Sequence, residues 1–127
     1  MAKKAIDLIQ YENVELIELK NYSRREVNLL LNAVDLALMT SITEGSPQFI
    51  KEAMACNCPI VSTNVGDVDE VIKNTDGCYI ASDNAADISV KIIQALKFGK
   101  RTNGRSQIDH FDNKIISSKI IKIYQQF

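Results

Sequence analysis

The chain reads LALMTSITEGSPQFIKEAMACNCPIVST from residue 36 to residue 63, and this stretch decides the fold. It begins with a short apolar run, Leu36–Thr40, typical of a strand that is buried on both faces. Pro47 is well placed at the first position of a helix, which we expect to extend to about Cys56, because Asn57 can take the left-handed conformation that ends a helix. The β-branched run Ile60–Thr63 then predicts a second strand. Strand, helix and strand joined by short loops predict parallel pairing with a helical crossover.

The same alternation continues on both sides of this stretch. In chain order, the other expected elements are a strand at 14–19, a helix opened by a capping box of Ser23 and Glu26, a short helix at 68–73, a strand at 78–81, a helix capped by Asn84 and ended by Gly99, and a last helix with Ile116, Ile120, Ile123 and Phe127 on one face. The order β-α-β-α-β-α-β-α-α predicts an α/β, Rossmann-like, mainly parallel sheet of about four strands. Ligands of such sheets bind outside the carboxyl ends of the strands, so we expect a site in the loops after Thr40 and Thr63.

Composition and charge limit the classes of function. The chain has 127 residues, of which 46% are apolar and 24% charged, and this predicts one globular domain over 1–127. Residues 1–90 carry 7 basic and 14 acidic side chains, whereas residues 91–127 carry 8 basic and 2 acidic ones. Such a split is compatible with a basic tail for nucleic acid or a membrane surface. Without an aromatic RNA-binding signature we favour a solvated terminal helix, no nucleic acid partner, and membrane contact that is peripheral at most.

Few residues in the chain suit metal or redox chemistry. His110 is the only histidine, and the cysteines are Cys56, Cys58 and Cys78. Zinc and redox loops usually need two residues between their cysteines, whereas only one residue separates Cys56 from Cys58. We therefore expect reduced, mostly buried thiols. The longest stretch without a charge, 53–66, is too short to span a bilayer, and no export signal opens the chain, so a cytoplasmic location is expected.

The loop and helix start after Thr40 have the chemistry of an anion site. Ser46 is a natural N-cap, and because Pro47 lacks an amide, the free donors would be Gln48, Phe49 and the next residue. Glu44 precedes the helix, and Glu52 lies on its edge about one and a half turns inside it. Two carboxylates beside a phosphate-sized positive pole suit a nucleotide sugar, although on their own such glutamates are more often plain surface residues.

The motif also resembles a known family. Residues 44–56 with Glu44 and Glu52, the run 59–63 and the segment 66–72 are similar to the group 1 (family 4) glycosyltransferases of GT-B fold, and the likeness extends from about Asn13 to the end. It includes Asp35, Gly77, and His110 with Phe111. The resemblance implies transfer of a sugar from a nucleotide sugar, with retention at the anomeric carbon and without a bound metal or other cofactor.

The resemblance also assigns roles to individual residues. Glu44 matches the glutamate that contacts the donor sugar near the reacting carbon, and we regard it as the catalytic candidate. Glu52 matches the glutamate that accepts hydrogen bonds from the ribose hydroxyls. The loop and helix start that hold the sugar and diphosphate correspond to Gly45, Ser46, Pro47, Gln48 and Phe49.

Three positions depart from the family pattern, because relatives commonly have glycine where Pro47, Asn57 and Asp67 stand. The last change creates Asp67-Val68-Asp69, a sequence with the form of a D-x-D metal motif, which we interpret as coincidental. The family's Arg/Lys pair for the diphosphate and its acceptor-binding domain lie upstream of the matched region.

We therefore expect part of a donor-binding domain that works with an acceptor-binding domain or a partner chain. A non-catalytic nucleotide-sugar-binding subunit and a degenerate structural relative are the alternatives. The resemblance implies two further strands, which would lie between residues 14–19 and 36–40 in the sheet and have no match in this sequence. Without them, residues 36–40 would be an unpaired edge prone to self-association.

Overall fold

The computed structural model describes residues 1–10 and 13–109, and its centre is a parallel sheet of three strands. The strands are β1 (Ala37–Met39), β2 (Ile60–Thr63) and β3 (Cys78–Ala81), arranged in the order β1-β2-β3. Leu38 pairs with Val61, and Val61 pairs with Tyr79. The α/β class and the parallel sheet are as predicted, but the described residues form three strands rather than four.

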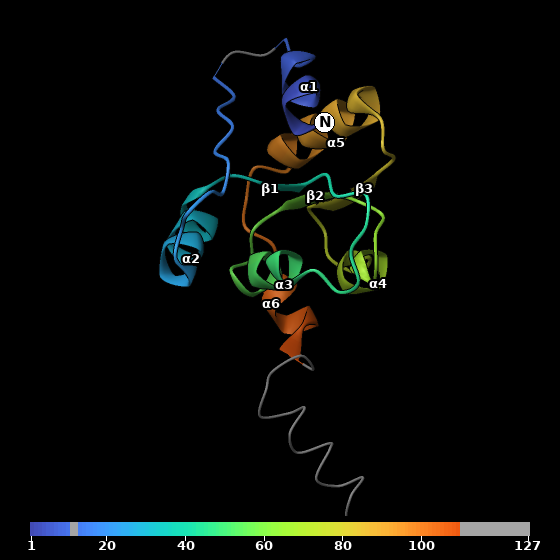
Figure 1. Cartoon of the computed structure of the whole chain (residues 1–127). Coiled ribbons are helices and arrows are strands. Elements are labelled where there is room, and N and C mark those ends of the chain that lie inside the picture. The colour runs from blue at the N-terminus through green and yellow to red at the C-terminus, as the bar shows by residue number, and fades with distance from the viewer. Residues whose placement is uncertain (11–12, 110–127) are drawn as a thin grey trace, which may run out of the picture.

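Six helices surround this sheet. They are α1 (Ala2–Asp7), α2 (Arg24–Ala33), α3 (Gln48–Ala55), α4 (Val68–Ile72), α5 (Ala85–Phe98) and α6 (Gly104–Gln107). Figure 1 shows α1 and α5 on one face of the sheet and α3 and α4 on the other, with α2 beyond β1 and α6 against α3. None of these helices is long and apolar enough to cross a membrane.

Two apolar cores lie on the two faces of the sheet. One contains Ile50 and Met54 of α3 together with Ile72 of α4, and the other contains Ile88 and Ile92 of α5. All four residues of β2 are buried, because this strand has a neighbour on each side and a core on each face. The central strand therefore fixes where the loops at its carboxyl end can lie.

The predicted helix ends are confirmed at four positions. The Ser23 hydroxyl accepts from the Glu26 amide at 3.2 Å, and the Glu26 carboxylate accepts from the Ser23 amide at 2.7 Å, which completes the capping box of α2. The Asn84 side chain accepts from two amides at the start of α5. Asn57 and Gly99 have φ values of 53° and 64°, so each takes the left-handed conformation that follows a helix.

The strand predicted at residues 14–19 is not formed. The segment forms no strand, and Val14 and Leu16 are half-buried whereas Ile17 and Leu19 are exposed. The apolar alternation that favours a strand is present, yet a strand also needs a partner for its backbone groups. The sheet's ladders join only β1, β2 and β3, so no described strand pairs with this segment.

Two short helices were not predicted, and both depend on tertiary contacts. α1 buries Ala5 against the core that α5 supplies. α6 lies in a stretch that we expected to be a loop, and it is held at Asn57, whose carbonyl accepts from the Thr102 amide and whose side chain accepts from the Arg105 amide. The last predicted helix, with His110 and Phe111 before it, lies outside the described residues.

Candidate functional site

The loops that follow β1 and β2 are bound to one another at the carboxyl edge of the sheet. The Thr63 hydroxyl donates to the Ser41 carbonyl at 2.6 Å, and the Asp67 amide donates to the Gly45 carbonyl at 3.1 Å. Gly66, with φ +55°, packs so closely that a Cβ built on it would lie 1.9 Å from the Gly45 oxygen. The two loops where we expected a site are therefore a single structural unit.

Helix α3 begins from this unit, but its cap differs from the expected one. Pro47 is the N-cap residue and no side chain caps the helix, whereas Ser46 was predicted to do so. The Ser46 hydroxyl instead donates to Asp67 Oδ2 at 2.6 Å and accepts from Lys51 Nζ. Since the first amides of a helix have no partner within it, those of Gln48 and Phe49 remain available to a bound anion.

Glu44 lies just before this helix start and is exposed. Its Oε1 accepts from the Ser41 hydroxyl at 3.2 Å. The two residues belong to one loop, and this hydrogen bond holds the carboxylate near the end of β1. Glu44 and Phe49 both line a cleft that opens beside this edge of the sheet.

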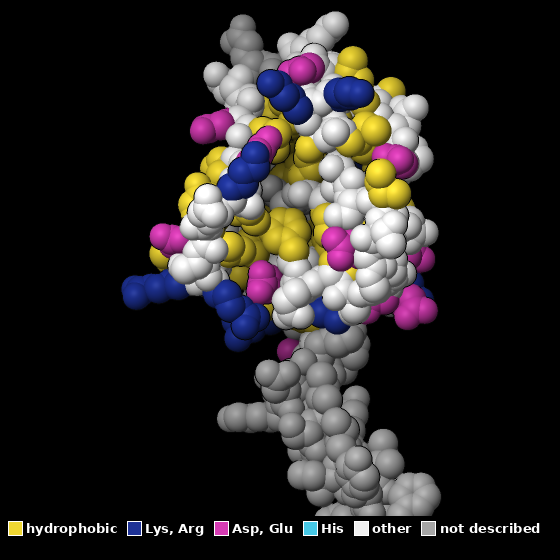
Figure 2. Space-filling view, in the orientation of Figure 1, with side chains coloured by type: hydrophobic (Ala, Val, Ile, Leu, Met, Phe, Trp, Pro, Cys, Tyr) yellow, Lys and Arg dark blue, Asp and Glu magenta, His cyan; other side chains and the backbone are white. Residues whose placement is uncertain are grey.

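The cleft has a volume of about 820 Å³ and lies between the extended segment 13–19 and β1. Figure 2 shows it as a hollow with apolar side chains on its floor. Its walls come from α1, α2, β1 and α5 as well as from the loop that carries Glu44. Most of the surrounding surface is apolar, so the carboxylate of Glu44 is placed at the rim of a largely apolar hollow.

Glu52 lies farther along α3 and faces another neighbour. Its Oε1 is 3.5 Å from Nη2 of Arg24, in the first turn of α2, and its side chain is 31% exposed. Phe49 is half-buried, and Ile50, Ala53 and Met54 are buried, so these four residues form the apolar side of the helix. The carboxylate of Glu52 therefore lies at the protein surface, within reach of a ligand.

The sequence motif did not identify three of these contacting residues. Arg24 contacts Glu52, and Lys51 and Asp67 contact Ser46. The sequence could have pointed to Asp67, because it stands where relatives commonly have glycine. It gave no reason to single out Lys51, since a lysine on a helix is usually a surface residue.

The three cysteines are free thiols. Cys58 is buried, as expected, but Cys56 and Cys78 are half-buried. Burial raises the pKa of Cys58 to about 11 and that of Cys78 to about 12. Both thiols are therefore protonated at neutral pH, and protonated thiols are poor nucleophiles.

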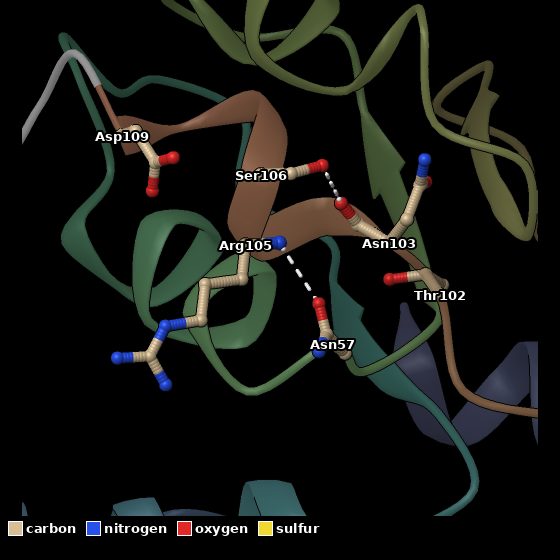
Figure 3. Close-up of a pocket in the computed structure, with 6 residues that line it drawn as sticks. All are labelled: Asn57, Thr102, Asn103, Arg105, Ser106 and Asp109. Atoms are coloured by element: carbon tan, nitrogen blue, oxygen red, sulfur yellow. Dashed lines mark hydrogen bonds between the residues drawn. The ribbon is translucent and has the colours of Figure 1, made fainter.

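A second, shallower pocket lies beyond the other end of α3 (Figure 3). The Asn57 side chain accepts from the Arg105 amide at 2.9 Å, and the Ser106 hydroxyl donates to the Asn103 carbonyl at 2.8 Å. These polar groups thus serve the local structure. The Arg105 guanidinium points away from the other labelled residues.

Comparison with known proteins gives a consistent relationship. The chain is 29% identical over 110 residues to an N,N'-diacetylbacillosaminyl-diphospho-undecaprenol alpha-1,3-N-acetylgalactosaminyltransferase of Campylobacter jejuni. The aligned region covers 82% of this chain and 29% of that protein. It is 28% identical over 100 residues to an N-acetyl-alpha-D-glucosaminyl L-malate synthase of Bacillus anthracis, covering 76% of this chain and 26% of that protein.

The chain thus spans less than a third of the length of these relatives. No solved structure matches it significantly. The family model described as "Glycosyl transferases group 1" matches residues 2–97, which include every strand of the sheet and both motif glutamates. The chain therefore belongs to the group 1 glycosyltransferases.

Proposed function

We propose that this chain binds the nucleotide-sugar donor of a sugar-transfer reaction at the start of α3. The observation that carries the proposal is the uncapped N-terminus of α3, which lies between Glu44 and Glu52 at the carboxyl edge of the sheet. A helix N-terminus of this kind favours an anion, and a nucleotide sugar has a diphosphate at its centre. Family membership supports the same class of ligand.

The two glutamates suit the two ends of such a donor. Glu52 is exposed enough to accept hydrogen bonds from ribose hydroxyls, in competition with Arg24. Glu44, at the rim of the cleft, is the candidate for the donor sugar, with Gly45, Ser46, Pro47, Gln48 and Phe49 next to the sugar and diphosphate. A carboxylate beside the sugar would also stabilise positive charge that develops on it during transfer.

We infer further that the transfer retains configuration at the anomeric carbon and uses no metal. Fixed dipoles and cations would then stabilise the departing diphosphate. The dipole of one helix contributes only about 0.3–2 kcal/mol, so a completing domain or partner chain has to add cations and the acceptor site. The open cleft beside β1 supports the proposal that another domain or chain completes the site. The cytoplasm is the compartment in which we expect the reaction.

The direct test is a titration of this chain with nucleotides, in which NMR chemical shifts of the backbone amides report binding. The panel contains the diphosphates of uridine, guanosine, adenosine and cytidine and their N-acetylhexosamine conjugates, because the names of both relatives refer to N-acetylated hexosamines. We expect at least one to bind with a Kd on the order of millimolar. The largest shifts should fall on the amides of Gln48 and Phe49.

Glu52→Ala should then weaken nucleoside diphosphate binding by about 1.5–3 kcal/mol, because the hydrogen bonds to a charged acceptor are lost. Glu70→Ala is the matched control, since Glu70 is an exposed glutamate on α4. Equal affinities for the wild-type chain and the Glu52 variant, or no binding of any nucleotide, would contradict the proposed site.

A further inference from the structure

Ser46 belongs to the loop that we propose for the donor, but its side chain does not cap helix α3. Its hydroxyl is the meeting point of two charged residues from different elements. It accepts from Lys51 Nζ of α3 and donates to Asp67 Oδ2 at 2.6 Å, in the segment between β2 and α4. A serine bonded on both sides by charged groups is held in one rotamer and one position.

The two charged partners also attract each other. Lys51 Nζ lies 3.8 Å from Asp67 Oδ2, and the two side chains are only 17% and 30% exposed. Partly buried charges are screened less by solvent and salt than fully exposed ones. The three side chains thus form one connected unit, which we call the Ser46 bracket: Ser46, Lys51 and Asp67.

The backbone around the bracket repeats the same connection. Asp67 donates its amide to the Gly45 carbonyl, and Gly66 packs directly on that carbonyl. The bracket and these backbone contacts join the 44–47 loop to the segment that follows β2. Glu44 of the loop and Phe49 of α3 line the cleft. The loop is therefore held by the segment after β2 and borders the cleft.

We propose that Ser46 is a positioning residue: through Asp67 and Lys51, its hydroxyl fixes the backbone of the 44–47 loop in the shape that receives the donor. This inference rests on the proposed function. A flexible loop would have to be ordered when ligand binds, and that ordering costs affinity. The bracket removes this cost in advance, and it does so without a side-chain contact to the ligand.

Ser46→Ala tests the proposal, because it removes the hydroxyl but keeps the net charge and the backbone amide. We expect hydrogen exchange of the Asp67 amide, which donates to the Gly45 carbonyl, to become about tenfold faster, on the scale of a lost charged hydrogen bond. Affinity for the tightest-binding nucleotide of the panel should fall severalfold. Ser46→Thr keeps a hydroxyl and should restore both values. Ser106→Ala is the control, since it removes an exposed hydroxyl with one local hydrogen bond on α6.

The outcomes separate this proposal from the one before it. Unchanged exchange of the Asp67 amide in Ser46→Ala would overturn the bracket, whatever the ligand does. Faster exchange with unchanged affinity, or a threonine variant that behaves like alanine, would overturn the positioning role. If the wild-type chain binds no nucleotide, the proposed function fails, and hydrogen exchange alone then decides whether the bracket holds the loop.

Discussion

Glu44 and Glu52 belong to one sequence motif, but the structure gives them different surroundings. Glu44 accepts from Ser41 within its own loop and lines the cleft, whereas Glu52 is paired with Arg24 of another helix. A ligand that reaches both must extend along the first turns of α3. The proposed roles, the donor sugar for Glu44 and the ribose for Glu52, come from the family resemblance, and the different surroundings of the two carboxylates support that division.

That division of roles predicts a selective effect of Glu44→Gln. The variant should weaken binding of a nucleotide sugar by about 1.5–3 kcal/mol, because the hydroxyls of the sugar lose a charged acceptor. It should leave binding of the bare nucleoside diphosphate unchanged, since that ligand has no sugar at this position. Parallel titrations with the two ligands measure the difference. Equal losses for both would show that Glu44 does not contact the sugar specifically.

Gly45 and Gly66 are in contact in the structure, but their replacement by alanine should change the stability by very different amounts. A Cβ on Gly45 would meet no atom within 4 Å, so Gly45→Ala should change the free energy of unfolding by less than about 0.5 kcal/mol. Gly66→Ala should lower that free energy by about 2–3 kcal/mol, because its φ is positive and its Cβ would collide with the backbone of Gly45.

Urea unfolding of both glycine variants checks this contrast. If Gly45 lies against the donor, Gly45→Ala should nevertheless weaken nucleotide-sugar binding, because the added methyl group occupies open space at the loop. A large loss of stability in Gly45→Ala would mean that this glycine is required by the fold rather than by the ligand.

Among the elements, the carboxyl-terminal ends of α2 and α3 are joined by one distant side chain. The Arg101 guanidinium donates to the carbonyls of Val34 and Leu31, at 2.8 and 2.6 Å, and to that of Cys56 at 2.8 Å. The last carbonyls of a helix have no partner within it, and a cation there is also favoured by the helix dipole. Arg101 therefore sets how α2, with Arg24, lies relative to α3, with Glu52.

Arg101→Met should lower the free energy of unfolding by about 1.5–3 kcal/mol, because it keeps the aliphatic stem but removes the charged donor. The matched control is Arg105→Met, because the Arg105 guanidinium points away from the other residues labelled in Figure 3 and the backbone contact of Arg105 to Asn57 is retained. Thermal and urea unfolding compare the two variants. Equal stability losses would show that the effect comes from charge or packing in general.

For the whole molecule, the decisive feature is the open side of the sheet. β1 is hydrogen-bonded to β2 on one side, and no described strand pairs with its other side, which faces the apolar cleft. An unpaired apolar edge can add a strand from another chain. The exposed apolar side chains of Ile17 and Leu19, at 41% and 42%, lie in the segment that borders this cleft.

We therefore expect the purified chain to self-associate as its concentration rises and to show no sugar transfer on its own. Replacing Ile17 and Leu19 together with lysine should reduce association without unfolding the chain, because both side chains are exposed. Analytical ultracentrifugation over a concentration series measures the first effect, and a transfer assay measures the second. A chain that is monomeric at all concentrations would contradict the open edge. A chain that transfers sugar alone would contradict the proposed need for a completing domain or partner chain.

The sequence by itself determined the parts of the protein that depend on neighbours a few residues away. The capping box at Ser23, the Asn84 cap and the left-handed Asn57 were predicted from local spacing, as were the βαβ unit and the helix that carries Glu52. These features could be predicted because the residues that form a cap or an apolar stripe lie within one or two helical turns of one another in the sequence. The motif glutamates were found from their places around the start of this helix together with the family resemblance.

The tertiary structure alone decided which distant groups meet. The alternation at residues 14–19 favours a strand, but a strand needs a partner, and no described strand pairs with the segment. Ser46 could cap α3 on local grounds, yet Asp67, 21 residues away, takes its hydroxyl. Arg101 reaches carbonyls 45 to 70 residues earlier. Such contacts depend on packing between elements, and no local pattern in a single sequence records which partner a side chain will find.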